Sequence, residues 1–118
     1  MSAAYQELFV EQGADYSTSI YVTDNYDVPL NLTGYGCKSQ IRRSYYTNSL
    51  VAEFQATITD PLNGGITLRI NNANTANISP GRYVYDVIVL DDPLDAANTI
   101  ITRVMEGIVN VSPSVTVP

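Results

Sequence analysis

A two-residue alternation of apolar and polar side chains runs through most of this chain and constrains its fold more than any other feature. In residues 15–23, Tyr16, Ile20 and Val22 fall on one face, and polar side chains lie between them. The same alternation returns in residues 35–42, 52–58 and 66–70. Successive side chains of a β-strand point to opposite faces, so this period predicts strands with one buried face. A 3.6-residue period never lasts longer than one turn, which argues against long helices.

Turn-forming residues separate the predicted strands at intervals of about 8 to 12 residues. They gather in residues 24–29, 60–65 and 91–95, which have the sequences DNYDVP, DPLNGG and DDPLD. Asp and Asn side chains hydrogen-bond to nearby backbone in turns, and proline cannot donate to a strand ladder. Residues 71–79, which contain four asparagines, predict one helical turn at most.

Two segments toward the C-terminus predict the centre of a sheet and its last strand. Residues 82–90 are apolar on nearly both faces, so we expect them to form the longest strand and to lie centrally. Residues 100–111 form the predicted closing strand. Its alternation changes phase near Glu106 and Gly107, and a glycine at such a change predicts a β-bulge there.

Together these segments give seven or eight short strands. A chain of 118 residues has the size of one domain and buries roughly two thirds of its unfolded surface, which is enough core to fold without disulfides. We therefore predict a single all-β domain over residues 1–118, with short flexible termini at about 1–4 and 113–118. The predicted architecture is an antiparallel β-sandwich of about seven to eight strands, and a small barrel is the alternative.

The charge and the missing residue types exclude several function classes. Twelve acidic residues against six basic ones give a net charge of −6 and a pI near 4.2. Such a chain repels phosphate backbones, so nucleic acid is not an expected partner. The chain has no histidine, which is the commonest general base and metal ligand, so we expect no catalytic residue, no metal and no cofactor. We see no export leader and no apolar run of membrane-spanning length, so we expect no membrane association.

Cys37 is the single cysteine, so no internal disulfide is expected. It falls in the inward-facing row of residues 35–42. A nucleophilic cysteine also needs a base to form its thiolate, and no histidine is present to supply one. We therefore interpret Cys37 as a small core residue.

Two carboxylates, Asp86 and Glu106, fall on predicted strands and are the acidic side chains that we expect to be partly buried. Paired carboxylates can perform acid and base chemistry, as in glycosidases. Buried acids are more often simply paired with a cation. We favour the interpretation in which Arg82, Arg103 or a turn amide satisfies them.

A second acidic group, Asp91, Asp92 and Asp95, lies in one predicted loop. Calcium is bound by six to eight oxygen ligands, and loops that hold it commonly space their acidic residues as D-x-D-x-D-G. This loop lacks that spacing, and Pro93 stiffens its middle. We favour a solvated acidic turn over a calcium site.

The chain has nine tyrosines and a single lysine. From this composition we expect that its main function is contact with other proteins. Tyrosine provides contact area at a low entropic cost, and lysine is depleted in the cores of interfaces. We predict a contact surface from the tyrosines on outward faces or in loops, together with the acidic loop: Tyr21, Tyr26, Tyr45, Tyr46, Asp91 and Asp92.

The stretch ISPGRYVYDV, residues 78–87, resembles the entry to strand F of immunoglobulin-like and fibronectin type III domains. There a Pro-Gly turn leads into a strand of the Tyr-x-Tyr-x-Val type. The resemblance implies that Pro80 and Gly81 form a structural corner. It also implies that Tyr83 is the corner tyrosine, with a buried ring and a hydroxyl bonded to backbone just upstream.

Over most of its length the chain resembles small immunoglobulin-like virion proteins of tailed bacteriophages. The stretches that carry this resemblance are LFVEQGADYSTSIYV, LNLTGYGCKSQIR, AEFQATITDPLNGGITLRI, ISPGRYVYDV and VMEGIVNVSPSVT. It implies a non-enzymatic virion structural protein, made in the host cytoplasm, that serves as a head decoration, neck, tail or baseplate adaptor component. Its implied partners are other virion proteins, with a homo-oligomer or many copies on a larger assembly.

Two alternatives stay open. One is a recognition module of the phage particle that binds a receptor or glycan through the loops holding Tyr26, Tyr45 and Tyr46. The other is a bacterial module of the fibronectin type III kind, which the neighbouring genes would distinguish.

Overall fold

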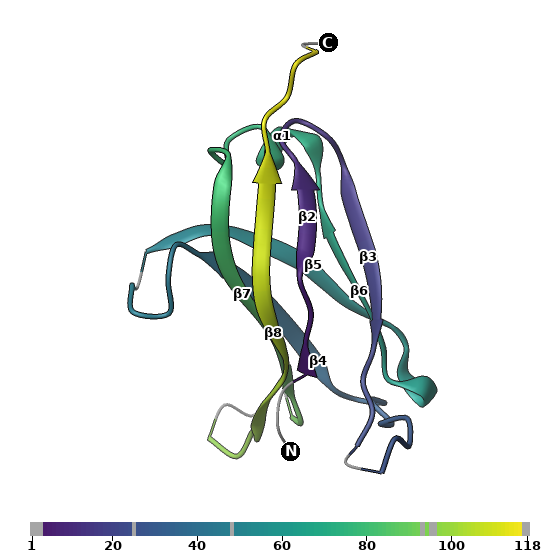
Figure 1. Cartoon of the computed structure of the whole chain (residues 1–118). Coiled ribbons are helices and arrows are strands. Elements are labelled where there is room, and N and C mark those ends of the chain that lie inside the picture. Colours follow the sequence, from purple (N-terminus) through teal and green to yellow (C-terminus); the bar gives the residue numbers. More distant parts are fainter. Residues whose placement is uncertain (1–3, 25, 48, 93, 95–96, 117–118) are drawn as a thin grey trace.

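The computed structural model describes residues 4–24, 26–47, 49–92, 94 and 97–116 (Figure 1). Strands dominate the part it describes. A short 3-10 helix, η1 (Pro61–Asn63), follows β5, and a short α-helix, α1 (Asn72–Thr75), follows β6. The strands in chain order are β1 (Ala4–Tyr5), β2 (Leu8–Glu11), β3 (Tyr16–Tyr21), β4 (Gly36–Arg42), β5 (Leu50–Asp60), β6 (Gly65–Ile70), β7 (Gly81–Leu90) and β8 (Ile101–Ser112).

The strands pair in the order β1-β8-β7-β4-β5-β6-β3, and β2 also pairs with β8. The long strand β5 belongs to two layers, because residues 50–54 pair with β4 and residues 55–60 pair with β6. The sheet therefore curls into two facing layers (Figure 1). The chain is an all-β sandwich, as the alternation predicted, with the immunoglobulin-like architecture that the resemblance implied. Its ladders are antiparallel except at the N-terminus, where β1 and β2 run parallel to β8.

The core lies between the layers and is built from the inward positions that the alternation predicted. Ile20, Ile41, Phe54 and Leu68 are all buried, from four different strands. The Phe54 ring packs edge-on against Tyr85 with ring centroids 6.1 Å apart, a favourable arrangement for aromatic pairs.

Strand β7 lies between β4 and β8, so its predicted central position is confirmed. It is not the longest strand, because β7 has 10 residues whereas β5 has 11 and β8 has 12. The extra length of β5 follows from its passage between the two layers. Helix α1 has only four residues, which confirms the prediction of one turn for residues 71–79. In the part of the chain that the structure describes, no helix is long and apolar enough to cross a membrane.

The predicted bulge in the last strand exists, but it lies before Gly107. Val87 pairs with Met105 while the next residue, Ile88, pairs with Arg103, so Val104 is the inserted residue. Val104 and Met105 are both buried, which explains the change of phase in the sequence. Because the inserted residue precedes the glycine, Gly107 is not required by the bulge.

Gly107 is required instead by the N-terminal segment that crosses it. A Cβ atom at position 107 would overlap the carbonyl oxygen of Gln6. That carbonyl accepts a hydrogen bond from the Tyr85 hydroxyl at 2.8 Å, and the Gln6 N–H donates to the Glu106 carbonyl at 3.0 Å. The interruption between β1 and β2 is therefore fixed to β7 and β8 at one point, which we call the Gln6 junction.

We expect Gly107→Ala to lower the free energy of unfolding by about 1–3 kcal/mol, because the new methyl group has to displace the Gln6 backbone. The amides of β2 should also exchange faster with solvent. Equilibrium denaturation and hydrogen exchange measure the two effects. Thr102→Ala, on β8 beyond the parallel pairing, is the control and should change neither. Unchanged stability in Gly107→Ala would contradict the role given to the Gln6 junction.

Candidate functional site

The outward side chains of β4, β7, β8 and β1 form one continuous surface, which we call the outer face. The register places Gln40, Asp86, Glu106 and Tyr5 in a single row across these four strands. Inward neighbours such as Ile41 are buried in the core. The same alternation that fills the core therefore selects the side chains that this surface presents.

Arg103 joins the two carboxylates of this row. Its Nε atom lies 3.2 Å from Asp86 Oδ2, and its Nη1 atom lies 3.5 Å from Glu106 Oε2. Asp86 and Glu106 are directly opposite each other on β7 and β8, so their repulsion is offset by one guanidinium between them. The interpretation of these acids as paired with an arginine is confirmed, and Arg103 is that arginine. Ion pairs this accessible contribute about 0–1 kcal/mol each, so they order the surface more than they stabilise the fold.

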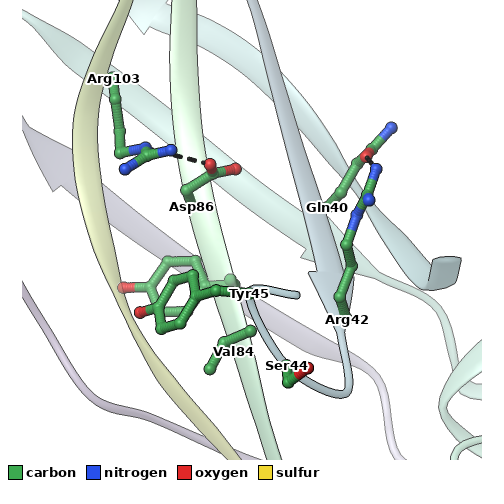
Figure 2. Close-up of a pocket in the computed structure, with 8 residues that line it drawn as sticks. Gln40, Arg42, Ser44, Tyr45, Val84, Asp86 and Arg103 are labelled. Carbon is green, nitrogen blue, oxygen red and sulfur yellow. Dashed lines mark hydrogen bonds and ion pairs between the residues drawn. The ribbon is translucent and has the colours of Figure 1, made fainter. Parts of the chain in front are cut away.

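Tyr45 lies over the outer face although it belongs to the loop between β4 and β5. It lines a concave site of about 210 Å³, which we call the Tyr45 site. Figure 2 shows the Tyr45 ring close to Val84, with Asp86 and Arg103 joined by an ion pair beyond them. Partial burial raises the pKa of the Tyr45 hydroxyl, and the nearby Glu106 carboxylate raises it further. The residues lining the site are Gln40, Arg42, Ser44, Tyr45, Val84, Tyr85, Asp86 and Arg103.

The loop that carries Tyr45 is held to its own strand. Arg42 donates to the Thr47 carbonyl at 3.1 Å and to Gln40 Oε1 at 3.0 Å, and the second of these bonds is drawn in Figure 2. These bonds close the loop onto β4. The Tyr45 site therefore offers a phenol ring beside amide, hydroxyl, guanidinium and carboxylate groups, a set suited to binding a polar surface.

Two exposed aromatic side chains extend the outer face at the N-terminal strands. Tyr5 is 63% exposed and Phe9 is 68% exposed. Tyr5 lies opposite Glu106, and Phe9 lies opposite Asn110. Neither residue was among the contact residues predicted from sequence. The signal was present for Phe9, because the inward positions of Leu8 and Val10 leave it pointing outward.

The predicted contact residues do not form one patch. Tyr45 and the 98%-exposed Tyr46 share the β4–β5 loop. Tyr21 ends β3 and lies on the outer side of the opposite layer, while Tyr26 is exposed in the loop between β3 and β4. Of the six predicted residues, those that share a loop are the sequence neighbours Tyr45 and Tyr46, and Asp91 and Asp92.

Asp91 and Asp92 are exposed and lie directly after β7. The Asp91 N–H donates to the Ile100 carbonyl and the Asp92 N–H to Thr99 Oγ1. Asp95, the third acid of the calcium alternative, lies outside the described residues. Within the residues that are described, no group of three or more Cys, Asp or Glu side chains is placed to hold a metal ion.

The predicted corner is present. Tyr83 is buried, and its hydroxyl donates to the Ser79 carbonyl at 2.5 Å, four residues upstream. Pro80 and Gly81 form the turn between them, with Gly81 at φ +149°. The Arg43 guanidinium lies 5.2 Å from the centroid of the Tyr83 ring, a cation–π distance. Tyr83 therefore has a buried ring and a hydroxyl bonded to backbone just upstream, the features that the resemblance implied.

Cys37 lies on the inward side of β4, packed against the core and half-buried. This burial raises the pKa of its thiol. A raised pKa lowers the thiolate fraction near neutral pH, which is the reverse of what an activated nucleophile requires.

We expect Tyr83→Phe to lower the free energy of unfolding by about 0.5–1.5 kcal/mol, because it removes the bond to Ser79 but keeps the ring. Tyr46→Phe is the matched control, since Tyr46 is fully exposed, and it should leave stability unchanged. Equilibrium denaturation checks both. If Tyr83→Phe is as stable as the parent chain, the hydrogen bond from Tyr83 to Ser79 does not stabilise the fold.

Comparison with known proteins gives structural neighbours alone. No protein-family model matches the chain, and no curated protein matches it. One similar structure is a chain of the crystal structure of ICOS in complex with ICOS-L and an anti ICOS-L VNAR domain, with a TM-score of 0.48 and 13% identity. The match covers 93% of this chain and 56% of that chain. Another is the extracellular domain of the voltage-gated sodium channel beta4 subunit, with a TM-score of 0.37, 9% identity, and coverage of 98% and 97%.

Proposed function

We propose that this chain is a non-enzymatic structural component of a bacteriophage particle, made in the host cytoplasm, that acts through protein–protein contacts. The sequence resemblance to small immunoglobulin-like virion proteins supports the proposal that the chain is part of a phage particle. The observation that carries the contact function is the set of exposed aromatic side chains on the outer face, namely Tyr5, Phe9 and Tyr45. Tyr5 lies opposite Glu106, and Tyr45 lines the same site as Asp86 and Arg103, while Phe9 lies further along β8, opposite Asn110.

Exposed aromatic rings beside a paired arginine have the composition of a contact surface. Interfaces are enriched in Tyr, Phe and Arg and depleted in Lys relative to the rest of a protein surface. Phe9 lies on β2 but outside the core. Burying the exposed two thirds of its side chain against a partner would contribute about 1–2 kcal/mol to the free energy of binding. Because Asp86 and Glu106 are both paired with Arg103, a partner can cover these two carboxylates with a cation still beside them.

The role requires modest contacts repeated many times. We propose other virion proteins as partners, with many copies of this chain on a larger assembly, as a head decoration, neck, tail or baseplate adaptor component. A regular assembly repeats the same interface at every copy, so weak individual contacts suffice. Nucleic acid and membranes are not part of the proposal, since the chain carries twice as many acidic as basic residues.

Mass spectrometry of purified particles of the encoding phage tests whether the chain is a particle component. We expect the chain to be detected in the particles. The double variant Phe9→Ala, Tyr45→Ala should associate with particles about tenfold more weakly or worse, because two rings leave the contact. Tyr26→Ala, which removes a more exposed ring away from the outer face, is the control and should associate normally. Absence of the chain from particles would contradict the proposed location. Normal association of the double variant would contradict the proposal that the outer face is the contact surface.

A second candidate function, a glycan- or receptor-binding module of the particle, is favoured by the Tyr45 site. The site is concave, with a phenol ring beside the amide of Gln40, the hydroxyl of Ser44 and the carboxylate of Asp86. Sugars bind through hydrogen bonds to such polar groups and through contact of their apolar faces with an aromatic ring. In this function the tyrosine contacts a sugar ring and not a protein.

A glycan array separates the two functions. If the second is correct, the parent chain binds a defined set of glycans, and Tyr45→Ala and Tyr46→Ala abolish that binding while the chain remains in particles. Tyr21→Ala, on the opposite layer, should bind like the parent. An array without signal, together with weak particle association of Tyr45→Ala, would exclude glycan binding in favour of the structural function.

A further inference from the structure

Strand β3 ends the sheet on one side and pairs only with β6 among the strands that the structure describes. Figure 1 shows it along the right margin of the molecule. An edge strand presents unpaired main-chain N–H and C=O groups, which can template pairing with another chain. The question is whether this edge is protected, as edges of monomeric proteins commonly are.

The register identifies which main-chain groups face the open side. The Val22 N–H donates to the Gly64 carbonyl at 2.9 Å, directly beyond the last β3–β6 pair, Tyr21 with Gly65. Hydrogen-bonded and non-hydrogen-bonded pairs alternate in an antiparallel ladder. The even-numbered residues of β3 therefore bond to β6, and the N–H and C=O groups of Ser17, Ser19 and Tyr21 point away from the sheet.

Nothing in β3 itself blocks this edge. Its sequence YSTSIY has no charge and no proline, and its register with β6 is unbroken over six pairs. The side chains also turn back over the sheet. The Ser19 hydroxyl lies 3.2 Å from Thr67 Oγ1, and the Tyr21 ring lies close to Gly65, where an added Cβ would meet Tyr21 Cε1 at 3.1 Å.

The opposite edge of the sheet differs. Strand β2 has only four residues, Leu8–Glu11, and acidic Glu7 and Glu11 flank its centre. Two copies of a chain with net charge −6 repel each other least where their meeting surface is uncharged. Strand β3 meets that condition and β2 does not. The occupant that β3 fits is a second copy of the same uncharged strand.

We propose that two copies of this chain pair through β3, antiparallel and related by a two-fold axis at Ser19. Opposite residues in a sheet point to the same face, and only Ser17, Ser19 and Tyr21 direct their main-chain groups outward. The register that uses all three pairs Ser19 with Ser19 of the second copy and Ser17 with Tyr21 of the second copy. Each such pair exchanges two main-chain hydrogen bonds, and the layer of β5, β6 and β3 continues into the second copy.

This inference deepens the proposed function, on which it rests only for the expectation of many copies, by naming the surface through which copies meet. A ladder of this length is smaller than the interfaces of stable dimers. Pairing should therefore depend on concentration in solution and be favoured where an assembly holds copies close together. The outer face lies on the other layer, so it remains open to a different partner.

Cysteine cross-linking tests the register. In a Cys37→Ser background, Ser19→Cys should form a disulfide-linked dimer on mild oxidation, because hydrogen-bonded antiparallel pairs place their Cα atoms about 5.5 Å apart. The control is Thr57→Cys, two strands away in the same row and on the same face. Its two copies would lie about 24 Å apart at a strand spacing of about 4.8 Å, so it should cross-link at least tenfold more slowly. Equal rates would overturn the proposal.

Sedimentation velocity over a range of concentrations tests the pairing without oxidation. The parent chain should show a monomer–dimer equilibrium. Ser19→Lys should remain monomeric, because it places two ammonium groups at the two-fold axis, whereas Thr57→Lys should dimerise like the parent. A parent chain that stays monomeric, or a dimer unaffected by Ser19→Lys, would overturn the proposal. Thermal melting confirms that both lysine variants fold.

The two proposals fail separately. A chain that is monomeric in solution but present in phage particles would contradict pairing through β3 and leave the structural function intact. If the chain dimerises through Ser19 but is absent from particles, the proposal that it is a particle component is wrong, and the pairing through β3 still holds.

Discussion

The contact at Gln6 is the constraint on which the functional surface depends. The Gln6 carbonyl accepts from the Tyr85 hydroxyl and lies where any side chain at position 107 would stand. This contact holds the N-terminal segment parallel to β8, so that Leu8 and Val10 enter the core. It also places Tyr5 and Phe9 on the outer face. Without it the core would lose part of one layer, and the aromatic surface would lose two of its three rings.

The curl of the sheet has a comparably simple cause. Because β5 pairs with β4 over its first half and with β6 over its second, one continuous strand links the layers. The two layers then present different chemistry. The β8-β7-β4 layer shows aromatic rings and ion pairs, while the β5-β6-β3 layer shows the hydroxyls of Ser19, Thr59 and Thr67, which contact one another. A protein with two unlike surfaces can contact two unlike neighbours.

Sequence alone predicted what depends on local pattern. The alternation of residues such as Ile20, Ile41 and Phe54 predicted the buried face of each strand. The corner at Tyr83 was implied by the resemblance that ISPGRYVYDV carries to known domains. The sequence did not predict the parallel pairing of β2, because that depends on contact with a strand about 100 residues away. For the same reason Gly107 was assigned to a bulge, although the Gln6 carbonyl explains it. The position of Tyr45 over β7 depends on how its loop closes, and periodicity does not report that.

Cryo-EM of the phage particle that contains this chain tests the central claim most directly, because it shows which surface meets a neighbour. We predict that Tyr5, Phe9 and Tyr45 are buried against another virion protein, with the Arg103 ion pairs beneath the contact. A map in which the outer face is open to solvent, while the chain is held only through its acidic or Tyr26 loops, would contradict it.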